Sequence, residues 1–337
     1  MALRSRASRV AGVILAACVF GAAQAASPQQ AGADALSRAM DAMVALEVTA
    51  ADDARSTATL GREREGSGVV IGADGLILTI GYLVVEADTI QVTTSDHRVV
   101  PARPVGYDLA TGFGLVRTVL PLEGIQPVTL GTARDVPVRT QLLVAVGGGA
   151  GMGLAQLVDV RPFSGSWEYH IDGALFTSPP LANHSGAALF DRRGQLLGIG
   201  SLFVSHALGD DRRVPGNMFV PVDLLKPILA EMLQTGSSHL SRRPWLGLNS
   251  TEQDGRVEVL KVMRDSPAEA AGLAAGDVVL AIDGEKVSTL EGFYRKLWSR
   301  GEPDSEIRLT VLHGADIRDV TVRAVDRMRT LRKPAGI

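Results

Sequence analysis

Residues 66–79 read GSGVVIGADGLILT, and the fold class can be worked out from this segment. One apolar run ends at Ile71, and a second begins at Leu76. Asp74 and Gly75 lie between them, and an Asp-Gly pair between two apolar runs is a strong signal for the turn of a β-hairpin. The segment therefore predicts two short antiparallel strands joined by a tight turn.

Short apolar segments separated by turn residues continue on both sides of this hairpin. The further expected strands are residues 44–48, 89–93, 115–117, 142–146, 154–158 and 217–221. Glycine is abundant, at 37 of 337 residues, which suits many tight turns. Such short strands are typical of an antiparallel barrel or sandwich, so a mainly β fold is expected, and the length suits two domains. Helices are expected at residues 29–43 and 222–233.

Residues 1–25 are expected to be a signal peptide. They begin with arginines, continue as an apolar run over residues 10–22 and end in AQA at residues 23–25, which suits cleavage. The alternative is a lipoprotein signal, LAAC, with the lipid on Cys18. Both readings predict a periplasmic or secreted protein.

Composition excludes several classes of site. The formal net charge of −3 gives no basic surface for nucleic acid. Cys18 is the only cysteine, so the folded part is predicted to lack disulfides, a thiolate nucleophile and a cysteine metal site. The histidines show no metal-ligand spacing, and no metal or cofactor is expected.

A second motif, LANHSGAAL at residues 181–189, places Ser185 in a turn before an apolar strand. Together with residues 66–92, it resembles the chymotrypsin-fold core of HtrA/Deg-type periplasmic proteases, which reads Gly-Ser-Gly, a strand, an Asp-Gly turn, then Leu-Thr-Asn-x-His-Val-Val. The resemblance implies a trypsin-like domain at residues 26–233, built as a chymotrypsin-like double β-barrel of six strands each. The active site is expected between the barrels.

The family's catalytic positions hold other residues in this sequence. Acyl transfer by serine needs a base, a carboxylate that orients the base, and N–H groups that stabilise the oxyanion. The resemblance places Leu83 at the histidine position, Gly112 at the aspartate position and Ser185 at the nucleophile position. Asn183 falls at an oxyanion-hole position, where asparagine tolerates positive φ better than most residues. Ala187 adds a methyl group where the family has glycine. The chain thus resembles a catalytically degenerate member.

Other residues were weighed as replacement bases. His170 lies on an expected strand and is the most plausible displaced base, although a partly buried structural role suits it better. His184 is adjacent to Ser185 in sequence, so its side chain is expected to point away. His97 and His206 lie in polar turns or loops. Asp108 matches a different family position, and a serine–lysine dyad is excluded because the first lysine is Lys226.

The strongest local motif is RDSPAEAAGLAAGDVVLAIDG at residues 264–284. It closely matches the central part of the PDZ domains of the same family, so a PDZ domain, a small β-barrel with helices, is expected at residues 244–326. A polar linker at residues 234–243 precedes it. A basic tail at residues 327–337 follows, and we expect it to be disordered.

Residues 245–248 resemble the carboxylate-binding loop of these PDZ domains. They are Trp245, Leu246, Gly247 and Leu248. Such a loop holds a chain-end carboxylate by successive backbone N–H groups, while the ligand adds a strand to the sheet edge. Residues 288–291 read as a capping box, and the helix that follows has an apolar stripe that would form one wall of the peptide site. The stripe is Leu290, Phe293, Tyr294, Leu297 and Trp298.

Two functions remain open from the sequence. The first is a proteolytically inactive HtrA/Deg-like homologue that binds peptides or unfolded proteins by their C-termini, as an adaptor, chaperone or regulator. The second is an active serine endopeptidase that uses Ser185 with a displaced base. Family members commonly form trimers, so a homo-oligomer is possible under either reading.

Overall fold

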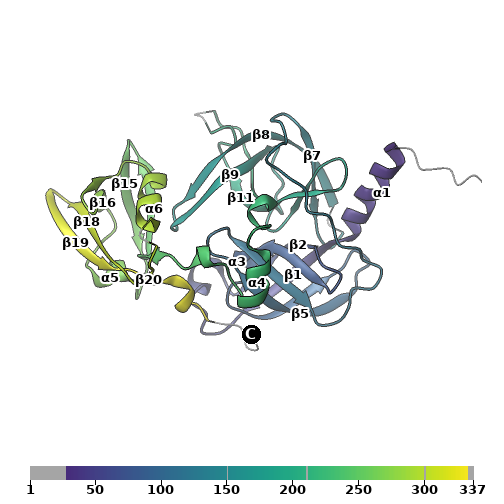
Figure 1. The fold of residues 1–337 in the computed structure, drawn as a ribbon, viewed down its shortest axis with the longest axis horizontal. Helices are drawn as coiled ribbons and strands as arrows, with labels where there is room; N and C mark the ends of the chain where they lie inside the picture. The colour runs from purple at the N-terminus through teal and green to yellow at the C-terminus, as the bar shows by residue number, and fades with distance from the viewer. Residues whose placement is uncertain (1–27, 150, 210–211, 300, 333–337) are drawn as a thin grey trace, which may run out of the picture.

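The computed structural model describes residues 28–149, 151–209, 212–299 and 301–332. Two closed β-barrels and a further β-sheet domain follow one another along the chain (Figure 1). The expected mainly β double-barrel architecture is therefore confirmed. The predicted signal peptide, residues 1–25 with Cys18, lies outside the described residues. Within the described ranges, no helix is both long and apolar enough to cross a membrane.

The first barrel follows α1 (Pro28–Asp41) and closes in the strand order β1-β2-β3-β6-β5-β4. The predicted hairpin is β2 paired with β3, with Val69 opposite Leu78. A four-residue helix, α3 (Gly81–Val84), follows β3 and carries the expected histidine position. The other elements are β1 (Met43–Ala50), α2 (Thr57–Leu60), β2 (Glu63–Val70), β3 (Leu76–Ile80), β4 (Ala87–Thr93), β5 (Val99–Tyr107) and β6 (Phe113–Thr118).

The second barrel closes in the order β10-β11-β12-β9-β8-β7. Its strands are β7 (Gln141–Val146), β8 (Gly151–Gly165), β9 (Tyr169–Ser178), β10 (Ala188–Phe190), β11 (Leu196–Val204) and β12 (Gly216–Pro221). Strand β8 is much longer than the predicted segment at 154–158, and the β8–β9 hairpin reaches toward the third domain (Figure 1). The two barrels share one apolar core that includes Phe113 and Phe176.

The helix predicted over residues 222–233 is interrupted. A 3₁₀ turn, η1 (Val222–Leu224), is followed by α4 (Leu229–Thr235). Pro227 lies between them, and proline has no N–H to donate and crowds the preceding helical turn. Helix α4 ends at Gly236, whose φ of +82° forms a left-handed cap.

The third domain has a six-stranded sheet in the order β14-β15-β16-β18-β19, with β17 paired to β16, and a separate two-stranded sheet, β13-β20. Helix α6 packs on the apolar core of this domain. The capping-box prediction was one residue early, because Thr289 is the N-cap and its hydroxyl accepts from Gly292. The elements are β13 (Pro244–Trp245), β14 (Leu248–Gln253), β15 (Arg256–Val262), α5 (Pro267–Ala270), β16 (Val278–Ile282), β17 (Glu285–Lys286), α6 (Leu290–Trp298), β18 (Glu306–His313), β19 (Asp316–Arg323) and β20 (Val325–Asp326).

Two segments are more ordered than the sequence suggested. The connector at 234–243 contains a 3₁₀ turn, η2 (His239–Ser241), and buries Ser238 and Ser241. The tail, expected to be disordered, forms η3 (Arg327–Arg329) after β20. Arg332 then returns to the first barrel, where its N–H donates to Glu86 and its guanidinium pairs with Asp53. For residues 327–332 that expectation was wrong, because these ion pairs and hydrogen bonds hold the basic segment.

Candidate active site

Ser185 lies in the turn before β10, and both barrels hold this turn. Its carbonyl oxygen accepts from the N–H of Ser67 on β2 at 2.8 Å, and the N–H of Gly186 donates to Gly200 on β11 at 2.9 Å. Gly186 has φ +73°, and a Cβ there would lie 1.9 Å from the carbonyl oxygen of Ser67. Only glycine fits at this position, and the turn is fixed at the junction of the barrels.

The side chain of Tyr82, on α3, contacts the Ser185 hydroxyl. Tyr82 Oη lies 2.8 Å from Ser185 Oγ and 2.9 Å from the carbonyl oxygen of Ser201. A phenol has one proton and a carbonyl only accepts, so both bonds form when Tyr82 donates to Ser201 and Ser185 donates to Tyr82. Burial raises the pKa of Tyr82 to about 12, and the bond with Ser185 opposes this shift. Near pH 7 the phenol is neutral and is not a base.

Leu83, the predicted histidine position, is buried beside the nucleophile turn. Counted from Leu78 along Leu-Thr-Asn-x-His, the family histidine falls one residue earlier, at Tyr82, whose phenol contacts Ser185, so the placement at Leu83 is one residue late. A Cβ built at Gly66 would lie 2.4 Å from Leu83 Cδ1 and 2.8 Å from the carbonyl oxygen of Ser185. The isobutyl group and the serine backbone therefore approach the same point of β2. Leu83 belongs to the core shared by the barrels, and its side chain has no atom that can accept a proton.

Gly112, at the predicted aspartate position, lies in the turn before β6. Its carbonyl oxygen accepts from the N–H of Gly81, at the start of α3, at 2.7 Å. Its φ is +82°, and a Cβ would lie 3.1 Å from Tyr169 Oη, which itself donates to the carbonyl of Thr111 at 2.6 Å. A side chain at this position would be strained and would crowd the Tyr169 hydroxyl.

Asp108 precedes this turn and is fully buried. Its Oδ1 accepts from the N–H and hydroxyl of Ser238 and from the hydroxyl of Ser241, and its Oδ2 accepts from the N–H and hydroxyl of Thr111. Burial alone would raise the pKa of Asp108, but these donors outweigh it and the net shift of the pKa is downward. Asp108 therefore ties the connector to the first barrel and orients no base.

Asn183 does not adopt the conformation that was considered for it. In the part of the chain that the structure describes, the non-glycine residues with positive φ do not include Asn183. The left-handed conformation that glycine or asparagine tolerates is therefore not used at this oxyanion-hole position.

His170 contacts a different part of the molecule from Ser185. Its Nδ1 lies 2.9 Å from Ser164 Oγ, and its Nε2 lies 3.5 Å from Asp172 Oδ1. Burial lowers the pKa of His170, and the charge of Arg295 lowers it further. These partners belong to the β8–β9 hairpin and α6, whereas Ser185 pairs with Tyr82. This geometry gives no support to His170 as a displaced base and suits a structural role.

The remaining candidates are also engaged elsewhere. His184 Nδ1 lies 3.0 Å from the carbonyl oxygen of Ala182 in its own loop. His97 occupies the β4–β5 turn with φ +63°, and Lys226 donates to the carbonyl oxygen of Gly131. Across the described ranges, no group of three or more His, Cys, Asp or Glu side chains is arranged to hold a metal.

The predicted carboxylate-binding loop surrounds a carboxylate of the chain itself. Glu168 Oε2 accepts from the N–H of Leu246 at 3.0 Å, and Oε1 accepts from Gly247 at 2.7 Å and Leu248 at 2.8 Å. Gly247 has φ +87°, and a Cβ there would lie 2.3 Å from Ser266 Cβ. Trp245 is buried in β13. The peptide-binding role of these residues stays a prediction.

Glu168 was not recognised from the sequence. It lies at the β8–β9 turn, is 4% exposed and has φ +57°. Burial raises the pKa of Glu168 despite the three N–H donors, which act to lower it. Since 78 to 80 positions separate it from its partners, no local sequence pattern identifies the contact.

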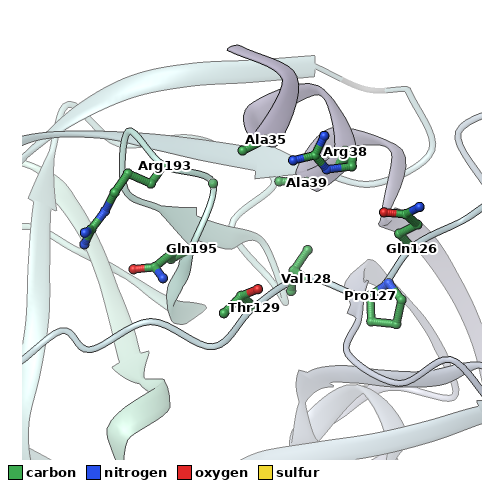
Figure 2. A pocket seen from close by; sticks show the side chains of 10 residues that line it. Ala35, Arg38, Ala39, Gln126, Pro127, Val128, Thr129, Arg193 and Gln195 are labelled. Carbon is green, nitrogen blue, oxygen red and sulfur yellow. The ribbon is translucent and has the colours of Figure 1, made fainter. Parts of the chain in front are cut away.

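A separate pocket of about 230 Å³ lies between α1 and two loops of the barrels. Figure 2 shows Arg38 entering it from α1, with Arg193 and Gln195 on the other side. Arg193 is exposed and pairs with Asp191. None of the predicted site residues lines this pocket, so it is distinct from the nucleophile turn.

Two domain families match this chain. Residues 66–199 match the trypsin-like peptidase domain, and residues 244–324 match the PDZ domain. The chain is 28% identical over 284 residues to a probable periplasmic serine endoprotease DegP-like of Halomonas elongata, covering 79% of this chain and 57% of that protein. It is 27% identical over 279 residues to the serine protease PepD of Mycobacterium tuberculosis, covering 74% and 58%. The chain thus spans less than two thirds of the length of these curated relatives.

Solved structures share the fold. The chain resembles the HtrA-type protease AlgW with decapeptide, with a TM-score of 0.54 and 23% identity over 90% of this chain and 99% of that one. It also resembles the serine endoprotease from Yersinia pestis, with a TM-score of 0.51 and 20% identity over 88% and 97%. The chain is thus similar in sequence to DegP-like periplasmic serine endoproteases, and its match to the trypsin-like peptidase domain precedes its match to the PDZ domain.

Proposed function

We propose that this chain is a peptide-binding HtrA homologue of the cell envelope whose peptidase domain does not hydrolyse peptide bonds by the serine-triad mechanism. The observation that carries the proposal is the surroundings of Ser185. Its hydroxyl is paired with the phenol of Tyr82, which stands at the base position when the motif is counted from Leu78, and Gly112 stands at the acid position.

The chemistry of these groups supports the proposal. With a pKa of about 12, the Tyr82 phenol is ionised in a fraction on the order of 10⁻⁵ of molecules at pH 7. Loss of a triad member costs on the order of 10⁴ or more in rate, even when the rest of the site is intact. In this chain both proton-handling positions are changed.

The second candidate is an active serine endopeptidase. Two observations favour it: Ser185 is present, and the relatives from Halomonas and Mycobacterium are named serine proteases. This reading needs a base that approaches Ser185 Oγ in place of Tyr82. For His170 to serve, the ring would have to leave Ser164 and Asp172.

Fluorophosphonate labelling of the purified mature protein separates the two candidates. A matched Ser185→Ala variant is the control, and circular dichroism confirms that both proteins are folded. We expect no labelling above that of the control. Labelling that disappears in Ser185→Ala would overturn the inactive reading and favour the endopeptidase.

The binding part of the proposal rests on the PDZ domain. We propose that residues 245–248 receive the C-termini of peptides or unfolded proteins, in an adaptor, chaperone or regulatory role. The structures of AlgW with a tripeptide and with a decapeptide support peptides as the ligand class. Relatives named periplasmic support a periplasmic location. A signal peptide at residues 1–25 and a trimeric assembly are proposed from the sequence alone, and light scattering tests the assembly.

We also propose the domain boundaries expected from the sequence. The peptidase domain covers residues 26–233, and the PDZ domain covers residues 244–326. Pairing of β13 with β20, which joins the first and last strands of the PDZ domain, supports its ends. Limited proteolysis tests these boundaries.

A further inference from the structure

The tip of the β8–β9 hairpin, residues 165–168, lies against α6 and the edge strand of the PDZ sheet (Figure 1). Ser250 of β14 donates its N–H to the carbonyl of Ser166 at 2.8 Å. Tyr294 of α6 donates its hydroxyl to the carbonyl of Gly165 at 2.8 Å. The tip therefore occupies the place between sheet edge and helix that a peptide ligand would take.

Residues 166–168 form a turn and do not pair with β14 as a strand, but their two contacts have the spacing that an added strand would have. Glu168 binds the N–H of Leu248, and Ser166, two residues earlier, binds the N–H of Ser250, two residues later. An extended peptide that runs antiparallel to β14 would place its terminal carboxylate at the N–H groups of residues 246–248. The backbone carbonyl two residues before its terminus would then meet the N–H of Ser250. The Glu168 side chain thus delivers a carboxylate where a chain end would deliver one.

Further contacts surround the tip. Arg243 donates to the carbonyl of Glu168 at 3.2 Å, and its guanidinium lies 3.5 Å from the ring centroid of Trp298. Asp172, on β9, pairs with Arg295 of α6 at 2.6 Å. These contacts join the second barrel to the PDZ domain, so release of the tip would break part of the contact between the domains.

We propose that residues 165–168 are an internal ligand of the PDZ domain, with the Glu168 carboxylate in the place of a chain-end carboxylate, so that an external C-terminus binds only after displacing this tip. The inference rests on the proposed peptide-binding function of residues 245–248. It adds that the site is occupied in cis and that ligand binding is coupled to undocking of the β8–β9 hairpin.

Docking of the internal ligand requires an unfavourable backbone conformation that an external peptide does not need, and this difference favours its displacement. Glu168 adopts φ +57°, which is unfavourable for a residue with a side chain. A chain-end carboxylate reaches the same three N–H groups from an extended backbone, without this strain. The apparent affinity for an external peptide is then reduced by the fraction of molecules in which the tip is docked.

Site-resolved hydrogen exchange on the mature full chain tests the docking. We compare wild type with Glu168→Gln, and we use Glu123→Gln, at an exposed glutamate, as the matched control. We expect exchange at residues 246–248 to rise by about tenfold or more in Glu168→Gln only, because these N–H groups lose a charged acceptor.

Ser250 is the informative amide. Its N–H is held by Ser166 and not by Glu168, so its exchange reports release of the whole tip. Faster exchange at Ser250 in Glu168→Gln supports the internal ligand. Unchanged exchange at Ser250 in a folded variant overturns it, because the tip would then stay in place without its carboxylate. If Glu168→Gln does not fold, Glu168→Asp gives the same comparison. Aspartate keeps the negative charge, but its shorter side chain withdraws the carboxylate from the three N–H groups.

Peptide binding distinguishes failure of this inference from failure of the proposed function. The probe is a fluorescein-labelled copy of residues 163–168, Phe-Ser-Gly-Ser-Trp-Glu, with a free terminal carboxylate. We expect Glu168→Gln to bind it about tenfold more tightly than wild type, as removal of the competing tip requires. Equal, tight binding by both proteins would overturn the internal ligand and leave PDZ peptide binding intact. Binding by neither protein, with faster exchange at Ser250, would support the internal ligand and count against peptide binding.

Discussion

The phenol oxygen of Tyr82 lies 2.8 Å from Ser185 Oγ, so the hydroxyl at the nucleophile position is paired with a weak acid. The same phenol lies 2.9 Å from the carbonyl oxygen of Ser201 on β11. Tyr82 therefore links α3 of the first barrel to the nucleophile turn and to a strand of the second barrel. In this arrangement the hydroxyl of Ser185 contributes to the contact between the barrels.

This pairing predicts an energetic coupling between the two hydroxyls. In a double-mutant cycle of Tyr82→Phe, Ser185→Ala and the double variant, we expect a coupling energy of about 0.5–1.5 kcal/mol, the usual worth of a partly buried hydrogen bond. Urea denaturation of the four proteins measures it. Additive effects of the two single variants would show that the hydroxyls do not interact in solution.

Gly112 should tolerate substitution less well than a glycine of similar φ in open space. Gly112→Ala adds left-handed strain of about 1 to 3 kcal/mol and a contact with Tyr169 Oη at 3.1 Å. Gly124 has φ +80° with nothing within 4 Å of its Cβ position, so Gly124→Ala adds strain alone. We expect the larger loss of unfolding free energy for Gly112→Ala. Equal losses would mean that Tyr169 moves away without cost.

Restoring the family residues should not restore normal catalysis. The double variant Tyr82→His with Gly112→Asp puts an imidazole beside Ser185, but it places the aspartate at φ +82°, where it crowds Tyr169. We expect at most weak casein hydrolysis, several powers of ten below an intact triad. The variant with Ser185→Ala added is the control for contaminating protease. Turnover close to that of an active family member would show that the turn at Gly112 adapts to an orienting acid.

Local sequence signals predicted most of the strands and helices. Contacts between residues that are distant in sequence could not be predicted in this way. The Asp-Gly turn at residues 74–75 has a local cause, and so has the helix start at Thr289. Pro227 was recognised in the sequence and was expected to be tolerated within the helix, but the helix is interrupted there. The Tyr82–Ser185 pair spans 103 positions and the Glu168–Gly247 pair spans 79, so both depend on how the barrels and the PDZ domain pack. Counted correctly, the motif places Tyr82 itself at the histidine position, so the first pair could have been predicted from the resemblance.

The buried carboxylate of Asp108 should make stability depend on pH in the acid range. Its folded-state pKa lies below the ordinary value, so its stabilising contribution is complete above the unfolded pKa of about 3.9 and is lost as pH falls through the folded value. Asp108→Asn leaves an amide facing N–H donors, and we expect it to cost about 2–4 kcal/mol at pH 7.

Urea denaturation of wild type and Asp108→Asn at pH 7, 5 and 3 checks this expectation. The difference between the two proteins should be unchanged from pH 7 to 5 and should shrink toward pH 3. Asp88→Asn, at an exposed position on β4, is the matched control and should show no such difference. A gap between wild type and Asp108→Asn that stays constant down to pH 3 would mean that the carboxylate is not selectively stabilised in its charged form.

The last prediction concerns Arg243, which packs between the carbonyl of Glu168 and the ring of Trp298. Burial lowers the pKa of Arg243 to about 10, so the guanidinium stays charged at pH 7. Arg243→Lys keeps the charge but loses the planar stacking, and lysine hydrates more strongly. We expect a loss of about 0.5–2 kcal/mol of unfolding free energy, the range of a cation–π contact. It should also speed exchange at Ser250, because Arg243 helps to hold the hairpin tip.

Arg242→Lys is the matched control, since Arg242 is the exposed neighbour in the same connector. It should change neither the unfolding free energy nor the exchange at Ser250. If Arg243→Lys lowers stability and leaves Ser250 protected, the stacking on Trp298 stabilises the PDZ domain alone, and the guanidinium does not hold the tip. If both quantities change together, the connector contributes to docking of the β8–β9 hairpin, and a peptide that displaces the tip must also overcome the contact of Arg243 with Glu168.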